Sequence, residues 1–281
     1  MTNPARPHRG FSEIVALPDE AIDLAQAALL IAREEYPGLR VGDYIARLEE
    51  MAATIRGRLG GGEGFTSLVA HVNRHLFGEL GFRGNREEYH DPRNSFLSDV
   101  LDRRVGIPIT LSTVYLEVAR RIGLRLAGVA FPGHFLVRYM GGDVHAEILI
   151  DPFNRGMLLT AEECRRRLDN RFQGQVPFRP ELLRRAHKRE ILERMLMNLR
   201  LIYQGQRDFH RALRIQNLLI DVRPGRPAAI RDRGLLYYRL ACLGQAAHDL
   251  RSYLKAAPTA PDAGTIGSRL VEISRLAPRM N

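Results

Sequence analysis

The stretch "GIPITLSTVY", Gly106–Tyr115, decides the fold, because a turn there leads into a helix with almost no polar face. The helix continues through "LEVARRIGL", and apolar residues all round it indicate burial on most sides. Pro108 favours a helix start, since proline in the first turn lacks only an N–H group that the helix does not use. Many hydrolases and transferases hold a nucleophile at such a position. This stretch contains no cysteine.

The segments on either side of this helix differ in character. Residues from about 12 to 80 have helical spacing, as in "DEAIDLAQAALLIAREE" from Asp19. The following "LRLAGVAFPGHFLVRYMGGDVHAEILIDPF" predicts strands separated by Pro132-Gly133 and by Gly141-Gly142-Asp143. After "QGQVPFRPE" the chain is helical again. Helices followed by a meander of strands predict an α+β fold.

The strand pair around "MGGDVH" predicts a histidine beside an aspartate. If residues 142–143 form a two-residue turn of type II′, opposing residue numbers sum to 285. Arg138 then faces Glu147 and His134 faces Asp151, with Cβ atoms ~4.5 to 5.5 Å apart. Such an aspartate fixes the imidazole tautomer, which is the arrangement of a base and its orienting group in a catalytic triad. The alternative is a structural pair that satisfies two polar groups at the end of a sheet.

Few side chains are candidates for a nucleophile beside this pair. Thr110 and Ser112 are the nearest hydroxyls, and we expect Ser112 to bond back to a carbonyl of its own helix. Cys164 lies in the first turn of a helix that the capping box "TAEE" begins, where nearby arginines could lower the pKa of its thiol. Nothing in the sequence directs Cys164 at His134.

The helix start itself could bind a ligand. Ile107 cannot cap the first N–H groups, so these groups would favour a carboxylate or a peptide carbonyl beside His134. We therefore expect a bound anion or main-chain carbonyl between the Ile109 or Thr110 amide and His134. The candidate binding residues are Pro108, Ile109, Thr110, Ser112 and Arg138.

Composition excludes several classes of protein. Of 281 residues, 45% are hydrophobic and 26% charged, which is ordinary for a globular protein. No apolar run approaches the ~20 residues of a membrane span, and the N-terminus lacks a secretion signal, so we expect a cytoplasmic protein without membrane contact. The net charge of +10 fits a solvated, arginine-rich surface better than a nucleic-acid site, which remains an alternative requiring an arginine stripe on one face.

We expect no metal and no cofactor. The two cysteines, Cys164 and Cys242, have no spacing typical of zinc or of a disulfide framework. His71 and His75 stand four residues apart on a predicted helix, a spacing that can bind metal, but the sequence offers no obvious third ligand.

The C-terminal part repeats itself. A shift of 34 residues places "LIY" at 201–203 on "LLY" at 235–237, Ala212 on Ala246, and Pro224 on Pro258. That period, with small residues where helices cross, is typical of tetratricopeptide repeats. Such repeats usually hold a protein or peptide, so we expect a partner of that kind. The alternative is a set of helical hairpins that only packs on the first domain.

Long motifs resemble a known family. "NSFLSDVLDRRVGIPITLSTVYLEVARRIGL", "GVAFPGHFLVRY" and "ILIDPFNRG", followed by the repeats, resemble the bacterial SirB-type family, whose central domain is transglutaminase-like (papain-like). That fold carries cysteine at the start of a central helix, histidine on one strand and aspartate on the next. By this resemblance His134 and Asp151 occupy the histidine and aspartate positions. The cysteine position falls at or beside Pro108.

The resemblance implies a domain plan and two hypotheses for function. We expect an N-terminal helical part (1–84), a transglutaminase-like core (85–180) and tetratricopeptide-like helices (181–281). The first hypothesis is a non-catalytic or catalytically altered protein that binds a protein or peptide through the residual His134–Asp151 site and the repeats. The second is a hydrolase or acyl transferase in which His134 and Asp151 activate water or a non-standard nucleophile, Ser112 or Cys164.

Overall fold

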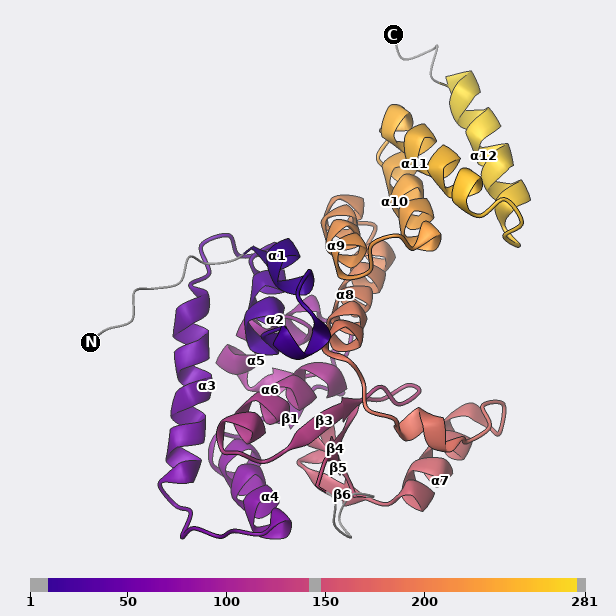
Figure 1. Cartoon of the computed structure of the whole chain (residues 1–281). Coiled ribbons are helices and arrows are strands. Elements are labelled where there is room, and N and C mark those ends of the chain that lie inside the picture. Colours follow the sequence, from indigo (N-terminus) through magenta and orange to yellow (C-terminus); the bar gives the residue numbers. More distant parts are fainter. Residues whose placement is uncertain (1–9, 142–147, 277–281) are drawn as a thin grey trace.

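The computed structural model describes residues 10–141 and 148–276. Four helices come first (Figure 1), and their bounds are α1 (Phe11–Val15), α2 (Leu24–Ala32), α3 (Val41–Arg56) and α4 (Phe65–Asn73). A π-helical turn, η2 (Arg74–Glu79), extends α4. The helix α2 begins later than the run from Asp19 suggests, because Asp23 accepts the Gln26 amide at 2.9 Å and caps it there. The residues before it form a 3₁₀ turn, η1 (Asp19–Ala21).

The helix α6 (Pro108–Arg121) forms the centre of the first part of the chain. Every residue from Pro108 to Ala119 is buried, as the apolar sequence predicts. Its N-cap is Ile107, which offers no side-chain acceptor. The shorter α5 (Leu97–Arg103), the 3₁₀ turn η3 (Pro92–Asn94) and a small parallel pair, β1 (Arg83–Gly84) and β2 (Val105–Gly106), lead into it.

A four-stranded antiparallel sheet lies between α6 and α7 (Ala161–Phe172). Its strands follow the chain as a meander, β3 (Leu126–Val129), β4 (Leu136–Tyr139), β5 (Leu149–Asp151) and β6 (Met157–Leu159). Val137 and Ile150 belong to the core that contains α6, whereas Leu136 and Leu149 pack with Leu168 of α7. Alternate residues of the strands therefore face opposite layers. This arrangement confirms the α+β class.

The predicted register of β4 and β5 is wrong by two residues. Val137 pairs with Ile150 and Arg138 with Leu149, so opposing numbers sum to 287. The proposed two-residue turn at Gly142-Asp143 and the partner Glu147 lie outside the described residues. A shift of two residues keeps each side chain on its own face of the sheet, so the apolar alternation could not distinguish the two registers.

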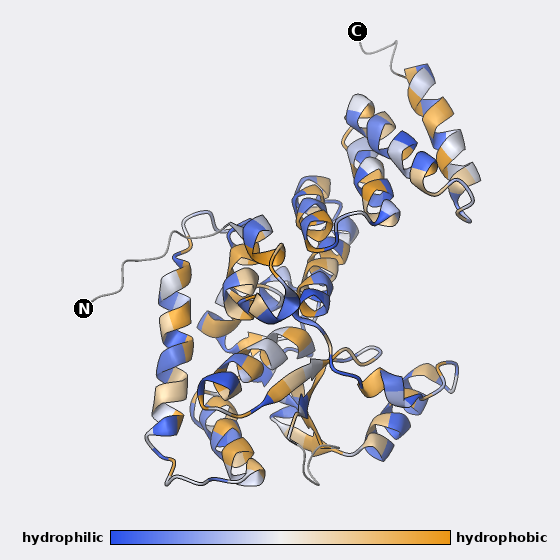
Figure 2. Ribbon diagram, viewed as in Figure 1, coloured by the Kyte–Doolittle hydropathy of each residue, from blue (hydrophilic) through white to orange (hydrophobic). Residues whose placement is uncertain are grey.

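The C-terminal helices repeat with the predicted period. They are α8 (Lys188–Gly205), α9 (Phe209–Val222), α10 (Pro227–Arg239), α11 (Leu243–Ala256) and α12 (Ala263–Leu276). The helices α9 and α11 are offset by 34 residues at both ends, and Ala212 and Ala246 are both 0% exposed. In Figure 1, α10–α12 project away from the rest of the molecule. Hydrophobic and hydrophilic residues alternate on these outer helices in Figure 2, as expected for helices with one buried face.

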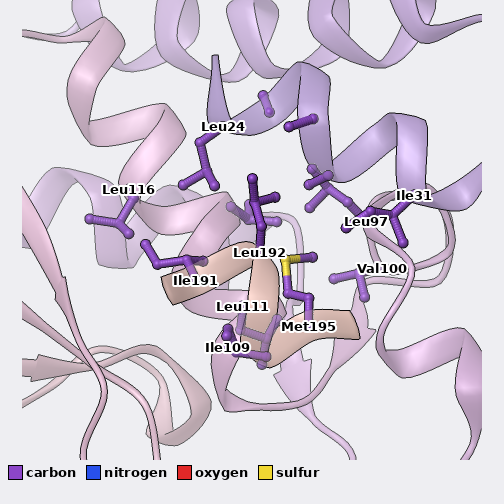
Figure 3. Packing of buried hydrophobic residues seen from close by; sticks show 14 of the residues in the cluster. Leu24, Ile31, Leu97, Val100, Ile109, Leu111, Leu116, Ile191, Leu192 and Met195 are labelled. Carbon is purple, nitrogen blue, oxygen red and sulfur yellow. The ribbon is translucent and has the colours of Figure 1, made fainter. Parts of the chain in front are cut away.

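The first helix of the repeats is built into the core of the first part. In Figure 3, residues of α8 meet residues of α2, α5 and α6; the labelled members are Ile191, Leu192, Met195, Leu24, Ile31, Leu97, Val100, Ile109, Leu111 and Leu116. The helices α10–α12 contribute to a separate cluster around Leu250. The predicted domain boundaries at residues 84 and 180 stay a prediction. The packing of α8 on α6 joins the start of the repeats to the first part of the chain. None of the described helices is long and apolar enough to span a membrane.

Candidate functional site

A tight turn places His134 immediately before β4. The carbonyl oxygen of Phe131 accepts the amide N–H of His134 at 3.0 Å, with Pro132 and Gly133 between them. Gly133 has a φ of +67°, which a residue with a side chain rarely adopts. Proline followed by a glycine of positive φ is the sequence of a type II turn, so "FPGH" itself explains where the imidazole stands.

His134 and Asp151 form a hydrogen-bonded pair, although the register that predicted their contact was wrong. The Nε2 atom of His134 lies 2.9 Å from Oδ1 of Asp151. Asp151 ends β5 and caps the 3₁₀ turn η5 (Pro152–Asn154), accepting the Asn154 amide at 3.2 Å and its side-chain N–H at 2.6 Å. Arg167 of α7 donates to Oδ2 at 3.0 Å. The local turn after β5, and not direct cross-strand pairing, sets this geometry.

Burial distinguishes the two members of the pair. The Asp151 side chain is 0% exposed and that of His134 is 23% exposed. Burial raises the pKa of Asp151, but the hydrogen bonds and positive charge supplied by His134, together with Asn154, outweigh it, so the pKa lies below its usual value. Asp151 is therefore a fixed anion that holds His134, and the ring nitrogen Nδ1 is not used by this bond.

Phe153 supports the imidazole from one edge. The two rings meet edge to face, with centroids 5.9 Å apart and planes at 84°. Phe153 also packs on Gly84, where an added Cβ would lie 2.5 Å from its ring. The guanidinium of Arg86 stands 5.2 Å from the centre of the Phe153 ring and donates to Asn154 Oδ1. The strand β1 thus holds the Phe153 ring in place, and that ring in turn supports the imidazole of His134.

A cavity of about 570 Å³, the His134 pocket, opens at this pair. Its walls come from the start of α6, the turn before β4, η5, β6 and α7; the lining includes Arg86, Tyr89, His90, Pro108, Phe131, Gly133, His134, Leu136, Phe153, Leu159, Cys164, Arg167, Leu168 and Arg171. Pro108 therefore shares the pocket with His134, as the sequence predicts. Proline offers no nucleophilic atom there.

A smaller hollow of about 30 Å³ adjoins the pocket at the first turn of α6. Its lining includes Pro108, Ile109, His134 and Arg194 of α8. Among residues 10–141 and 148–276, no acceptor is found for the amide N–H of Ile109 or Thr110. The structure thus brings together three of the predicted residues, Pro108, Ile109 and His134. Whether they bind an anion stays a prediction.

The other predicted binding residues lie away from both cavities. The Thr110 hydroxyl is buried and donates to the Asn94 carbonyl at 2.7 Å. Ser112 is 0% exposed, and its hydroxyl donates to the Phe135 carbonyl at 3.5 Å. The expected bond to its own helix is wrong, because the residue just before β4 supplies the acceptor. Arg138 directs its guanidinium to the Leu183 carbonyl at 3.3 Å.

Cys164 lies in the wall of the His134 pocket. The predicted capping box is present, with Thr160 accepting the Glu163 amide at 3.2 Å. The thiol, however, is fully buried, and burial raises its pKa to about 11 despite the charge of Arg167. Arg167 does act to lower this pKa, as predicted, but desolvation of the thiolate is the larger effect, so the pKa is raised overall.

Sequence reasoning missed the arginines around the pocket. Arg167 and Arg171 are four residues apart on α7 and share a face with Leu168, a spacing that could have indicated them. Arg86 and Arg194 come from distant elements, and no local pattern marks them. They reach the site only because β1 and α8 pack around α6.

Of the two histidines His71 and His75, the second lies in η2 and has a carboxylate partner there. The buried ring of His75 bonds through Nδ1 to Glu79 Oε2 at 2.7 Å. Within the described part of the chain, no group of three or more histidine, cysteine, aspartate or glutamate side chains could hold a metal ion.

Comparison with known proteins places these observations in context. The profile of the transglutaminase-like superfamily matches residues 42–197, and that of the tetratricopeptide repeat matches residues 199–271. A UPF0162 protein of Xylella fastidiosa (strain 9a5c) is 39% identical over 267 residues, which cover 94% of each chain. The UPF0162 protein PA3419 of Pseudomonas aeruginosa is 31% identical, covering 92% of this chain and 93% of that one. F-box only protein 21 of Mus musculus is 43% identical over 99 residues, 33% of this chain and 16% of that protein.

Proposed function

Since the chain belongs to the transglutaminase-like superfamily and, along nearly its whole length, to the UPF0162 proteins, we propose that it binds a peptide in the His134 pocket without reacting with it. In this proposal His134 and Asp151 position the ligand, and the tetratricopeptide helices contribute further contact with the same partner. The narrower assignment to the SirB-type family is part of the proposal and rests on the motifs of α6 and β3–β5.

One observation carries the proposal. An intact His134–Asp151 pair opens on a cavity of about 570 Å³, and the helix start beside it holds Pro108. In a thiol enzyme the histidine takes a proton from a sulfur at that helix start, and the histidine and aspartate contribute to catalysis only when that sulfur is present. Here the pair is kept, the cavity is open and Pro108 contributes only carbon atoms. Recognition of a ligand accounts for all three features.

The surroundings support a peptide in preference to a small ligand. A second hollow, of about 380 Å³, runs along α8 and is lined by Asn198, Leu201 and Ile202. Tyr89 and His90 line both this hollow and the His134 pocket. Leu201 is 58% exposed although it is a large apolar residue. An extended peptide could therefore pass from His134 to the first repeat helix without leaving the surface.

Cys164 gives the catalytic alternative its one specific support, because its thiol lies in the wall of the same pocket. A pKa of about 11 leaves almost no thiolate at neutral pH, and burial keeps the sulfur from a substrate. Ser112 is bonded to the Phe135 carbonyl inside the core. Both facts favour binding over acyl transfer.

A retention experiment tests the proposal. Immobilised full-length protein is incubated with a pool of random hexapeptides that have blocked termini, and retained peptides are identified by mass spectrometry. We expect intact peptides to be retained by the wild type and lost with His134→Ala. His71→Ala, on α4 and outside the pocket, is the matched control and should retain the wild-type set. Equal retention of peptides by the wild type and by His134→Ala would argue against the proposal. Cleaved or covalently attached peptides would establish the catalytic alternative.

A further inference from the structure

We infer that the His134 pocket selects a carboxylate, so that the peptide it binds is acidic. The inference rests on the proposed peptide-binding function and adds the chemical class of the ligand.

Positive charge is in excess around the pocket. Arg86, Arg167 and Arg171 line it, and Asp151 pairs with Arg167 alone of these three. In the described ranges 10–141 and 148–276, no carboxylate forms an ion pair with Arg86 or Arg171. Since guanidinium groups bind carboxylates through two parallel hydrogen bonds, this cavity offers donors that no carboxylate of the described residues occupies.

Arg171 is held against the turn that positions His134. A Cβ atom added at Gly133 would lie 2.3 Å from Nε of Arg171, so the guanidinium occupies the space that only glycine leaves free. The same side chain stands 5.9 Å from the ring centre of Phe172. Arg171 is exposed, but these two contacts restrict it on one side, and a restricted cation loses less conformational entropy on binding than an unrestricted one does.

Arg194 adds a cation behind His134. It reaches the small hollow from α8, donates to the Phe131 carbonyl at 3.2 Å and stands 5.7 Å from the Phe135 ring centre. None of the described carboxylates pairs with it, and burial lowers the pKa of its guanidinium. Arg194 is half-buried, and a partly desolvated charge without a counter-ion among the described residues is unfavourable, so a bound anion near this hollow would be stabilised by Arg194 as well.

Apolar side chains form part of the pocket wall beside the arginines and favour one kind of anion. Phe131, Leu136, Leu159 and Leu168 face the cavity together with the arginines. A fully hydrated inorganic ion would leave this surface in water, whereas a peptide residue could bury it while its carboxylate meets Arg171. The carboxylate could come from a glutamate or aspartate side chain or from a peptide C-terminus.

The test compares pools of peptides that differ in one charge. Full-length protein is incubated at ~0.15 M salt, where general attraction to a cationic surface is largely screened. The probe is an equal mixture of terminally blocked hexapeptides whose third residue is glutamate or glutamine. We expect the retained glutamate-to-glutamine ratio to be at least about ten, because a hydrogen bond to a charged group contributes a factor of that size or more.

Two variants locate the selecting group. Arg171→Gln should bring the ratio towards one, while Arg165→Gln should leave it unchanged. Arg165 is the matched control because it lies on the same helix, has a 58% exposed side chain and pairs with Glu162 outside the pocket. A third pool, with glutamine at the third residue and a free C-terminus, distinguishes a terminal carboxylate from a side-chain one: enrichment of either carboxylate source supports the inference.

The outcomes separate this inference from the proposed function. If glutamate and glutamine peptides are retained equally and the free C-terminus gives no enrichment, carboxylate selection is wrong and peptide binding stands. If no pool is retained, both ideas are wrong. If the ratio survives Arg171→Gln but falls with Arg165→Gln, the charge acts outside the pocket and the inference is overturned. Displacement of the glutamate pool by inorganic phosphate at concentrations where acetate has no effect would also overturn it.

Discussion

Replacing Asp151 by asparagine tests whether the His134 pair is a structural unit as well as a binding site. The substitution keeps the size of the side chain and removes the charge that meets His134 at 2.9 Å and Arg167 at 3.0 Å. Breaking a buried, hydrogen-bonded ion pair from one side costs about 3 to 5 kcal/mol. The Arg167 side chain is 41% exposed, so solvent screens the contribution of its ion pair with Asp151 to the unfolding free energy. We therefore expect the lower figure, a loss of about 3 kcal/mol.

The assay is thermal unfolding of the full-length chain followed by circular dichroism. For a protein of this size, 1 kcal/mol shifts Tm by about 2 to 4 °C, so Asp151→Asn should lower Tm by about 6 to 12 °C. Asp169→Asn is the matched control, because Asp169 is an exposed carboxylate on α7, and we expect a change below about 0.5 kcal/mol. Equal Tm values for the two variants would refute the view that Asp151 organises the turn and the histidine.

Three further outcomes follow from the same contacts. The pKa of the Asp151 carboxyl is lowered on folding, so the stability that this carboxylate contributes is complete above its unfolded pKa of about 4 and is lost as the pH falls through its folded pKa. The unfolding free energies of the wild type and of Asp151→Asn should therefore converge in acid. A constant difference between them from pH 7 to pH 2 would contradict this. Gly133→Ala should cost at least about 1 to 2 kcal/mol in urea unfolding, because φ is +67° and the methyl group displaces Arg171; an unchanged midpoint would contradict the description of the turn. Leu192→Ala, in α8, should cost about 2 to 5 kcal/mol and destabilise the first part of the chain as well, whereas loss confined to the repeats would show that α8 is not part of that core.

Much of the fold could be predicted from local pattern. The unbroken apolar surface of Pro108–Ala119 predicts a central helix, and twelve consecutive buried residues agree. The 34-residue shift predicts the offset between α9 and α11, because each repeat must bury the same face against its neighbour. The sequence "FPGH" predicts a turn before β4. In each case a short stretch contains the whole physical reason.

The site depended on contacts that no short stretch contains. The His134–Asp151 contact was expected for the wrong reason, since the β4–β5 register differs by two residues while the alternation of faces is the same. The capping of η5 by Asp151 brings its carboxylate back to the histidine. Arg86 and Arg194 lie more than a hundred residues apart in the chain, and only the packing around α6 brings one to the His134 pocket and the other to the adjoining small hollow.

The central claim is that this chain keeps the geometry of a thiol site around a position that holds Pro108. Pro108→Cys, made together with Cys242→Ser, places a sulfur at the start of α6 beside His134, while the buried Cys164 stays unreactive. The rate of alkylation by iodoacetamide, measured from pH 5 to pH 10, gives the pKa of the new thiol. We expect a value at or below about 7.5, set by the helix start and His134, and a return towards the ordinary value of about 8.5 when His134→Ala is added. A thiol that titrates near 8.5 with and without His134 would contradict the account.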